Sequence, residues 1–208
     1  ALEPALDGHL RRLDGIEDPR EAADRFFEFR VADIAMGSGH FLVAAIDRIE
    51  RRLSNHLAKR ALPGVSDELD RLRRTAREAL GDDWDGEPIE DARLLRRQIA
   101  RRCIYGVDLN PLAVELARLS VWIHTFIPGL PLSLLDHNLV VGNSLVGIAT
   151  FAEAAELIGE HSGDLFSFTA GERLAQVREP IRKLARLADA NAAEIREAKK
   201  LYAEARRK

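Results

Sequence analysis

The stretch VADIAMGSGHFLVAAIDRIE, residues 31–50, decides the fold class of this chain of 208 residues. An apolar, β-prone run ends at Asp33, a turn follows at Gly37, Ser38 and Gly39, and an amphipathic helical pattern begins after it. A strand, a glycine turn and a helix in this order are typical of a parallel α/β sheet, in which the turn presents backbone N–H groups to a ligand.

The composition is that of a globular protein with 46% hydrophobic and 31% charged residues. The net charge of −3 gives no global signature of nucleic-acid binding, so a DNA partner would need a local basic patch. The single Cys103 excludes an internal disulfide and indicates a reducing, cytoplasmic setting. No stretch is long and apolar enough to predict a membrane span.

Two further strands are predicted downstream, and each ends on a polar residue. Residues 102–111, RCIYGVDLNP, form a strand that ends on Asp108, and Asn110 is placed to cap the next helix. Residues 139–147, LVVGNSLVG, form a strand that ends at Gly142 and Asn143. Because ligands bind beyond the carboxyl ends of parallel strands, Asp33, Asp108 and Asn143 are expected to share one crevice.

The remaining segments are predicted to be mainly helical. We expect a helical segment at 1–28, an α/β core at 29–150 with a helical insertion at about 58–101, and a helical arm at 151–208. In the core, Leu42, Ala45, Ile46, Ile49 and Leu53 share one stripe, and Ser66 is predicted to cap a second helix. The helix after Asn110 is apolar on most sides and is expected to be largely buried. In the arm, the apolar spacing of three and four involves Leu174, Val177, Ile181, Leu184 and Ala188.

The two strand-end acids favour a particular class of ligand. The turn lacks the third glycine of the dinucleotide fingerprint, and Asp33 and Asp108 stand 75 positions apart, where that fingerprint expects about 20. A carboxylate suits an ammonium group or a ribose diol better than it suits a diphosphate. S-adenosylmethionine has both features and no phosphate.

Three motifs together resemble the DNA adenine-N6 methyltransferases, in particular the large bacterial restriction–modification and phage-defence methylases. DIAMGSGHFLVAA resembles their first motif, IYGVDLNPLAVELARLSVW the second, and LDHNLVVGNSLVG the third. The resemblance covers roughly residues 28–150 and implies a Rossmann-like, S-adenosylmethionine-dependent core with double-stranded DNA as the partner.

The resemblance also implies roles for individual residues. Asp33 and the glycine turn would hold the methionine end of the cofactor, and Phe41 would pack beneath the turn. Asp108 would take the ribose hydroxyls, Leu109 would lie against the adenine, and Asn143 would meet the adenine amino edge. The full predicted cofactor-binding set is Asp33, Ala35, Gly37, Ser38, Gly39, Phe41, Asp108, Leu109, Asn110, Asn143 and Ser144.

The sequence departs from the family pattern in two respects. Ile34 and Met36 replace the usual Pro and Cys, and both are expected to face the core. No two prolines are adjacent, so the Asn/Asp-Pro-Pro-aromatic loop that holds a flipped base is missing. We therefore expect a cofactor-binding portion of a longer methylase, inactive alone, with no catalytic residue and no metal of its own.

Plainer interpretations remain open for several features. Gly37 and Gly39 also suit an ordinary turn, and Gly-Asn is a common turn pair. His40, His124 and His137 lack ligand spacing, and Cys103 reads as a buried strand residue. The arginine-rich segments are expected to be solvated helix faces, and neither Trp84 nor Trp122 has basic neighbours arranged as a base-stacking platform.

Two rival functions follow from these alternatives. One is a methyltransferase acting on RNA, protein or a small molecule. The other is a non-catalytic helical interaction module on a degenerate nucleotide-binding core. The sequence leaves the oligomeric state open.

Overall fold

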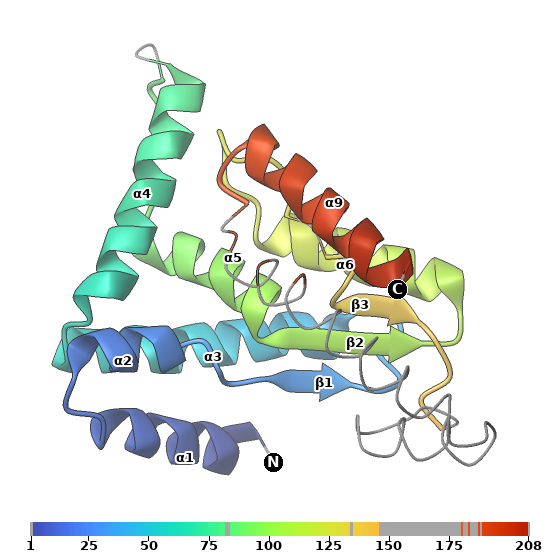
Figure 1. Cartoon of the computed structure of the whole chain (residues 1–208), viewed down its shortest axis with the longest axis horizontal. Coiled ribbons are helices and arrows are strands. Elements are labelled where there is room, and N and C mark those ends of the chain that lie inside the picture. Colours follow the sequence, from blue (N-terminus) through green and yellow to red (C-terminus); the bar gives the residue numbers. More distant parts are fainter. Residues whose placement is uncertain are drawn as a thin grey trace, which may run out of the picture.

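Three short parallel strands and the helices around them make up the fold in this computed structural model (Figure 1). The structure describes residues 2–81, 84–133, 135–145, 180, 183, 187 and 189–207. In chain order the elements are α1 (Leu2–Asp14), α2 (Pro19–Arg25), β1 (Val31–Asp33), α3 (His40–Lys59), α4 (Pro63–Leu80), α5 (Asp91–Arg102), β2 (Ile104–Asp108), α6 (Pro111–His124), β3 (Leu139–Val141) and α9 (Ala192–Arg207).

The sheet has the strand order β1-β2-β3, and both pairs are parallel. The α/β class and the parallel arrangement agree with the prediction, and the small sheet is compatible with a Rossmann-like fold. The strands are shorter than predicted, above all β3, where residues 142–145 continue outside the ladder.

Helices α3 and α6 cover the same face of this sheet (Figure 1). Gly106 lies in the middle of β2 beneath them, and an added Cβ there would collide with the sulfur of Met36. The predicted stripe of α3 is confirmed: Leu42, Ile46 and its other members are all buried. This apolar stripe, with the 3.6-residue period, fixes which side of α3 faces the sheet.

Helix α6 corrects a prediction. Asn110 caps it as expected, since its side chain accepts from Leu112 N at 3.0 Å, and Pro111 occupies the first turn. The helix is not largely buried, however. Its inward face is limited to Val114, Ala117 and Val121, while four large apolar side chains on the other face are exposed. The sequence of α6 is apolar on two faces of the helix, and only one of these faces packs against the core.

Helix α4 begins earlier than predicted. Its N-cap is Leu62 and Pro63 opens the first turn, so Ser66 lies inside the helix. Proline suits this place because its missing N–H is one that a first turn leaves unbonded. The apolar residues Val65, Leu69 and Leu72 of α4 are buried, which attaches the predicted insertion to the core.

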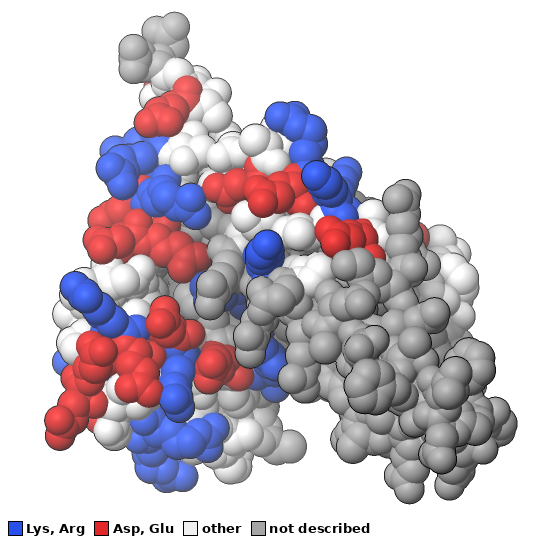
Figure 2. Space-filling model, in the orientation of Figure 1, with Lys and Arg blue, Asp and Glu red and all other residues white. Residues whose placement is uncertain are grey.

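The arginine-rich segments are paired with acids from neighbouring helices. Arg48 and Arg52 of α3 form ion pairs with Glu3 and Asp7 of α1, and Arg102 of α5 pairs with Glu68 of α4 at 3.2 Å. Figure 2 shows the same mixing, with acidic and basic side chains interleaved over the face in view. These pairs fit solvated helix faces rather than a phosphate-binding surface. In α5 the prediction is wrong for Arg97 and Arg101, which are buried and donate to Asp189.

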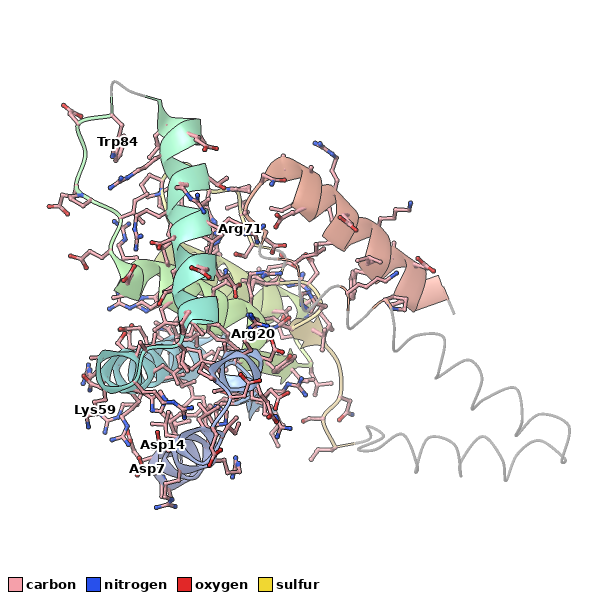
Figure 3. The ribbon with its side chains drawn as sticks, turned by 60° about the vertical axis from the view of Figure 1, so that its left-hand side comes forward. Asp7, Asp14, Arg20, Lys59, Arg71 and Trp84 are labelled. Carbon is pink, nitrogen blue, oxygen red and sulfur yellow. The ribbon has the colours of Figure 1, made fainter. Side chains whose placement is uncertain are left out.

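Helix α9 is fastened to the core by charged residues. Arg71 of α4 donates to Glu194 of α9 at 3.2 Å (Figure 3). Just before α9, Asp189 is fully buried and accepts from Arg101 Nε at 2.7 Å. The predicted arm stripe at 174–188 lies outside the described residues. Among the helices that are described, none combines the length and apolarity that a membrane span requires.

Candidate functional site

The carboxyl ends of β1 and β2 and the turn after β3 meet at one edge of the sheet (Figure 1). The register pairs Asp33 with Gly106 and Asp108 with Val141, so Asp108 extends two residues beyond Asp33. Gly142 N donates to the carbonyl oxygen of Asp108 at 3.0 Å, which holds the turn after β3 beside the end of β2.

The Asp108 side chain joins the turns that follow β1 and β2. Its Oδ2 accepts from Gly37 N at 2.9 Å and its Oδ1 accepts from Asn110 N at 2.8 Å. Gly37 is 71 positions away in the sequence. The structure therefore brings the glycine turn and the second strand-end acid, which were predicted separately, into direct contact.

These hydrogen bonds, first from Asn110 and then from Gly37, lower the pKa of Asp108. A backbone N–H stabilises the charged carboxylate, so this group is ionised at neutral pH. Each carboxylate oxygen has about two acceptor positions and uses one of them here. Asp108 therefore retains acceptor capacity for two hydroxyl donors.

The two glycines of the turn are needed for different structural reasons. Both have positive φ, +54° at Gly37 and +83° at Gly39. A Cβ at Gly39 would lie 3.1 Å from the Cα and Cβ of Ala117, so this glycine permits close contact between α3 and α6. A Cβ at Gly37 would meet nothing within 4 Å. The backbone at Gly37 is therefore open to a ligand.

Asp33 and Ser38 complete the polar lining beside β1. Asp33 Oδ1 accepts from Ala35 N at 3.1 Å, in a local turn, and its carboxylate is half-buried. Ser38 Oγ lies 2.9 Å from His40 Nδ1 at the start of α3. These groups place a carboxylate, a hydroxyl and an imidazole around the turn.

Asn143 and Ser144 are exposed in the turn after β3. The Asn143 side chain accepts from Leu145 N at 2.9 Å, an arrangement typical of a local turn. Its backbone neighbour Gly142 touches Asp108, as described above, so the turn belongs to the same edge. Asn143 therefore lies near the site, and its side-chain carbonyl oxygen already accepts a hydrogen bond within the turn.

Two predicted packing positions are wrong. Phe41 does not pack beneath the glycine turn, because it lies on the outer side of the first turn of α3 and is 52% exposed. Ile34 does not face the core and is 62% exposed, whereas Met36 is buried as expected. Leu109 is 67% exposed. The edge therefore presents apolar side chains as well as acids to solvent.

Sequence reasoning missed Gly106, which the site needs. With no side chain of its own it leaves room for Met36, whose N donates to the carbonyl oxygen of Val107 at 3.1 Å. That bond brings the chain after β1 back toward β2, where Gly37 reaches Asp108. The available signal was a glycine inside a strand pattern, which often marks a close approach of other groups.

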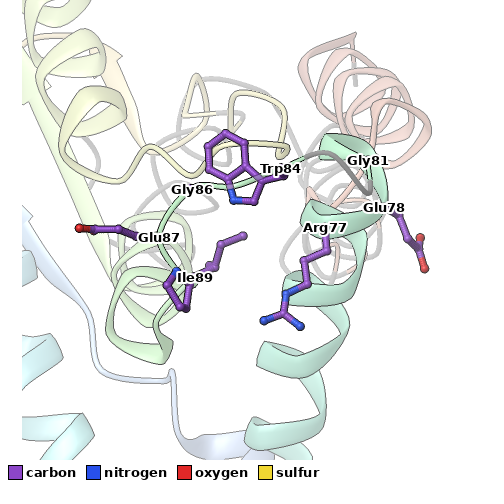
Figure 4. Close-up of a pocket in the computed structure, with 8 residues that line it drawn as sticks. Arg77, Glu78, Gly81, Trp84, Gly86, Glu87 and Ile89 are labelled. Carbon is purple, nitrogen blue, oxygen red and sulfur yellow. The ribbon is translucent and has the colours of Figure 1, made fainter.

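Trp84 has both basic and acidic neighbours. It lies in a pocket of about 600 Å³ between the end of α4 and the loop before α5, and Arg77 lines the same pocket (Figure 4). Glu78 and Glu87 line it too, which makes it a mixed surface rather than a basic platform. This pocket lies on the far side of the fold from the strand ends (Figure 1).

The environments of the histidines and the cysteine indicate structural roles rather than metal binding. His124 Nε2 lies 2.8 Å from Asp47 Oδ1, and burial is the main cause that lowers the pKa of His137 to about 4. Cys103 is buried, as predicted, and burial raises the pKa of its thiol to about 12. Within the described parts of the chain, no three His, Cys, Asp or Glu side chains gather as a metal site requires.

Comparison with known proteins gives one curated relative. Over 138 residues the chain is 29% identical to the "Putative type II restriction enzyme and methyltransferase RM.MjaORFECS2P" of Methanocaldococcus jannaschii. The match covers 62% of this chain and only 9% of the relative, so the chain spans a small part of that protein's length. No family model matches the sequence. No solved structure matches it either.

Proposed function

We propose that this chain is the S-adenosylmethionine-binding portion of a DNA adenine-N6 methyltransferase of a restriction–modification or phage-defence system. The observation that carries the proposal is the Asp108 carboxylate, held by the amides of Gly37 and Asn110 and still able to accept two hydroxyl groups. The similarity to a protein named as a restriction enzyme and methyltransferase supports the same class of reaction.

The residues at the strand edge fit this cofactor. Asp108 would accept from the ribose hydroxyls, and the open backbone at Gly37 would lie against the methionine end, whose ammonium group suits Asp33. The exposed Leu109 would offer an apolar contact for the adenine ring, and the turn at Asn143 and Ser144 would border the amino edge of that ring. Glycines at the turn let the backbone approach closely, as in other nucleotide sites.

When bound, S-adenosylmethionine supplies a methyl group activated by the positive charge on sulfur. The contribution of this chain would be orientation: Asp108 and the glycine turn fix the cofactor so that its methyl group faces a target nitrogen. The chain has no Pro-Pro-aromatic loop to hold a flipped base. We propose that this loop and the DNA contacts belong to another part of the protein.

Calorimetric titration tests the cofactor assignment. We expect the chain to bind S-adenosylmethionine and not NAD, and Asp108→Asn to weaken binding about tenfold or more, because a neutral amide is a poorer acceptor for a diol. Asp24→Asn, an exposed carboxylate on α2, is the matched control and should leave affinity unchanged. Binding of NAD in preference, or unchanged affinity in Asp108→Asn, would remove the proposed site.

The DNA specificity requires the full-length protein that contains this chain. Nucleosides from DNA treated with that protein and S-adenosylmethionine should contain N6-methyladenine, measured by mass spectrometry. Methylated cytosine instead would contradict the adenine assignment while leaving the cofactor site intact. Methyl transfer to RNA or protein alone would favour the rival methyltransferase classes.

A further inference from the structure

The outer face of α6 carries an exposed apolar stripe. Leu112, Leu116, Leu119 and Ile123 are 66%, 45%, 47% and 62% exposed, and their spacing of four, three and four residues places them in one row. Phe126, just after the helix, is 45% exposed and packs edge-on against Trp122 at 5.8 Å. Scattered exposed leucines are ordinary, but a continuous row of them is not.

This row is separate from the core contact of α6. The buried residues Val114, Ala117 and Val121 lie on the opposite side and already hold the helix on the sheet. The row is therefore not needed to attach α6. Among the described elements, the main contacts of α6 are with α3, β2 and β3, so no other described helix packs extensively against it.

Among the residues that the structure describes, the charged side chains beside the centre of the row are paired with one another. The two charged residues nearest its centre, Glu115 and Arg118, form an ion pair with each other at 2.6 Å beside the row. Ala113 and Ser120 flank it with small side chains. Charged residues are depleted at the centre of protein interfaces, and small flanking residues allow two helices to approach closely.

We infer that the outer face of α6 is an interface for a second copy of this chain, with the two α6 helices antiparallel about a two-fold axis. The 4-3-4 spacing is that of a coiled-coil seam. With the axis between Leu116 and Leu119, Leu116 lies opposite the partner's Leu119 and Leu112 lies opposite the partner's Ile123. The row is therefore complementary to its own two-fold copy.

The area agrees with a modest dimer. The five exposed apolar side chains lie on and just after one helix, so the contact is smaller than the about 800 Å² per partner of a standard interface. Arg118 pairs with Glu115 at 2.6 Å and with Asp136 at 3.3 Å, so both acids beside the row are bound to a basic side chain. We expect reversible association with a measurable dissociation constant rather than a permanent dimer.

Sedimentation equilibrium of the 208-residue chain, over about a hundredfold range of concentration, tests this inference. The unaltered chain should approach the dimer mass at the upper end. Leu116→Glu with Leu119→Glu should remain monomeric, because four carboxylates would face one another. Leu132→Glu replaces an apolar residue that is 54% exposed outside α6, and this control should still dimerise.

A charge exchange tests the geometry. In Leu116→Glu with Leu119→Lys, the antiparallel arrangement places each glutamate opposite the partner's lysine, so dimerisation should return at low salt and weaken at high salt. A parallel arrangement would place like charges together and give no recovery. Circular dichroism of each variant checks that the helices are retained.

Two results would overturn the inference. A chain that stays monomeric throughout the concentration range would show that the row serves a different occupant. A dimer that survives Leu116→Glu with Leu119→Glu would show that it forms through another surface. Neither result bears on S-adenosylmethionine binding, which is measured separately by calorimetry.

Discussion

Replacing Gly39 by alanine should destabilise the fold by about 2–5 kcal/mol. Its φ of +83° is in the left-handed region, where a side chain costs about 1–2 kcal/mol. The new Cβ would also lie 3.1 Å from the Cα and Cβ of Ala117 on α6, and overpacking of this kind costs about 1–3 kcal/mol. The first cost comes from the backbone conformation at Gly39, and the second from the closeness of Ala117 on α6.

Gly37→Ala is the matched control for this prediction. Gly37 also has positive φ, at +54°, but a Cβ there meets nothing within 4 Å, so only the backbone cost of about 1–2 kcal/mol applies. Urea unfolding followed by circular dichroism gives the free energy of unfolding of both variants. If Gly39→Ala costs no more than Gly37→Ala, the close approach of Gly39 to Ala117 does not govern stability and the reasoning fails.

Three further predictions concern buried polar groups. Burial lowers the pKa of His137 from 6.5 to about 4, so between these pH values its side chain is neutral in the folded protein and takes up a proton on unfolding. The free energy of unfolding should therefore fall by at most about 3 kcal/mol as the pH decreases from 6.5 to 4. His137→Gln should make the free energy of unfolding, measured with urea, depend less on pH in this range. Arg101→Ala should cost about 3–5 kcal/mol and speed proteolysis next to α9, because it removes a buried ion pair with Asp189. Arg25→Ala, in an exposed pair with Glu21, should cost less than about 1 kcal/mol. Cys103, with a thiol pKa of about 12, should react with a disulfide reagent only at the rate of unfolding; rapid labelling of the native chain would contradict its burial.

Local sequence patterns predicted the elements of the core well. The stripe from Leu42 to Leu53 and the cap at Asn110 are confirmed, because both depend on neighbours within a few residues. The parallel sheet also followed from the order of strands and helices. The start of α4 was wrong because Ser66 and Pro63 both suit a first turn, and the sequence alone does not choose between them.

Burial was harder to predict, because it depends on what packs against a face. The exposed row on α6 consists of apolar residues, so the sequence predicted that it is buried. The exposure of Phe41 and Ile34 depends on how their segments are oriented relative to the core. Conversely, Arg97 and Arg101 read as part of a solvated face but are buried. Their partner Asp189 is some 90 positions away, a distance that helical periodicity does not reach.

The candidate site was predicted in its parts but not in its connections. Asp33, Asp108 and the glycine turn were identified from their places after strands. The bond between Asp108 and Gly37 was not, because it depends on the register of β1 on β2.

The carboxylate shared by two turns has a consequence for how the molecule can be observed. Since the amide protons of Gly37 and Asn110 are held by the same side chain, an opening that swings Asp108 away frees both to exchange with deuterated solvent. Any change in conditions that alters this opening should therefore change the hydrogen-exchange rates of both amides in the same direction. The NMR signals of these two amides would then report how often the hydrogen bonds to Asp108 open, without an attached probe.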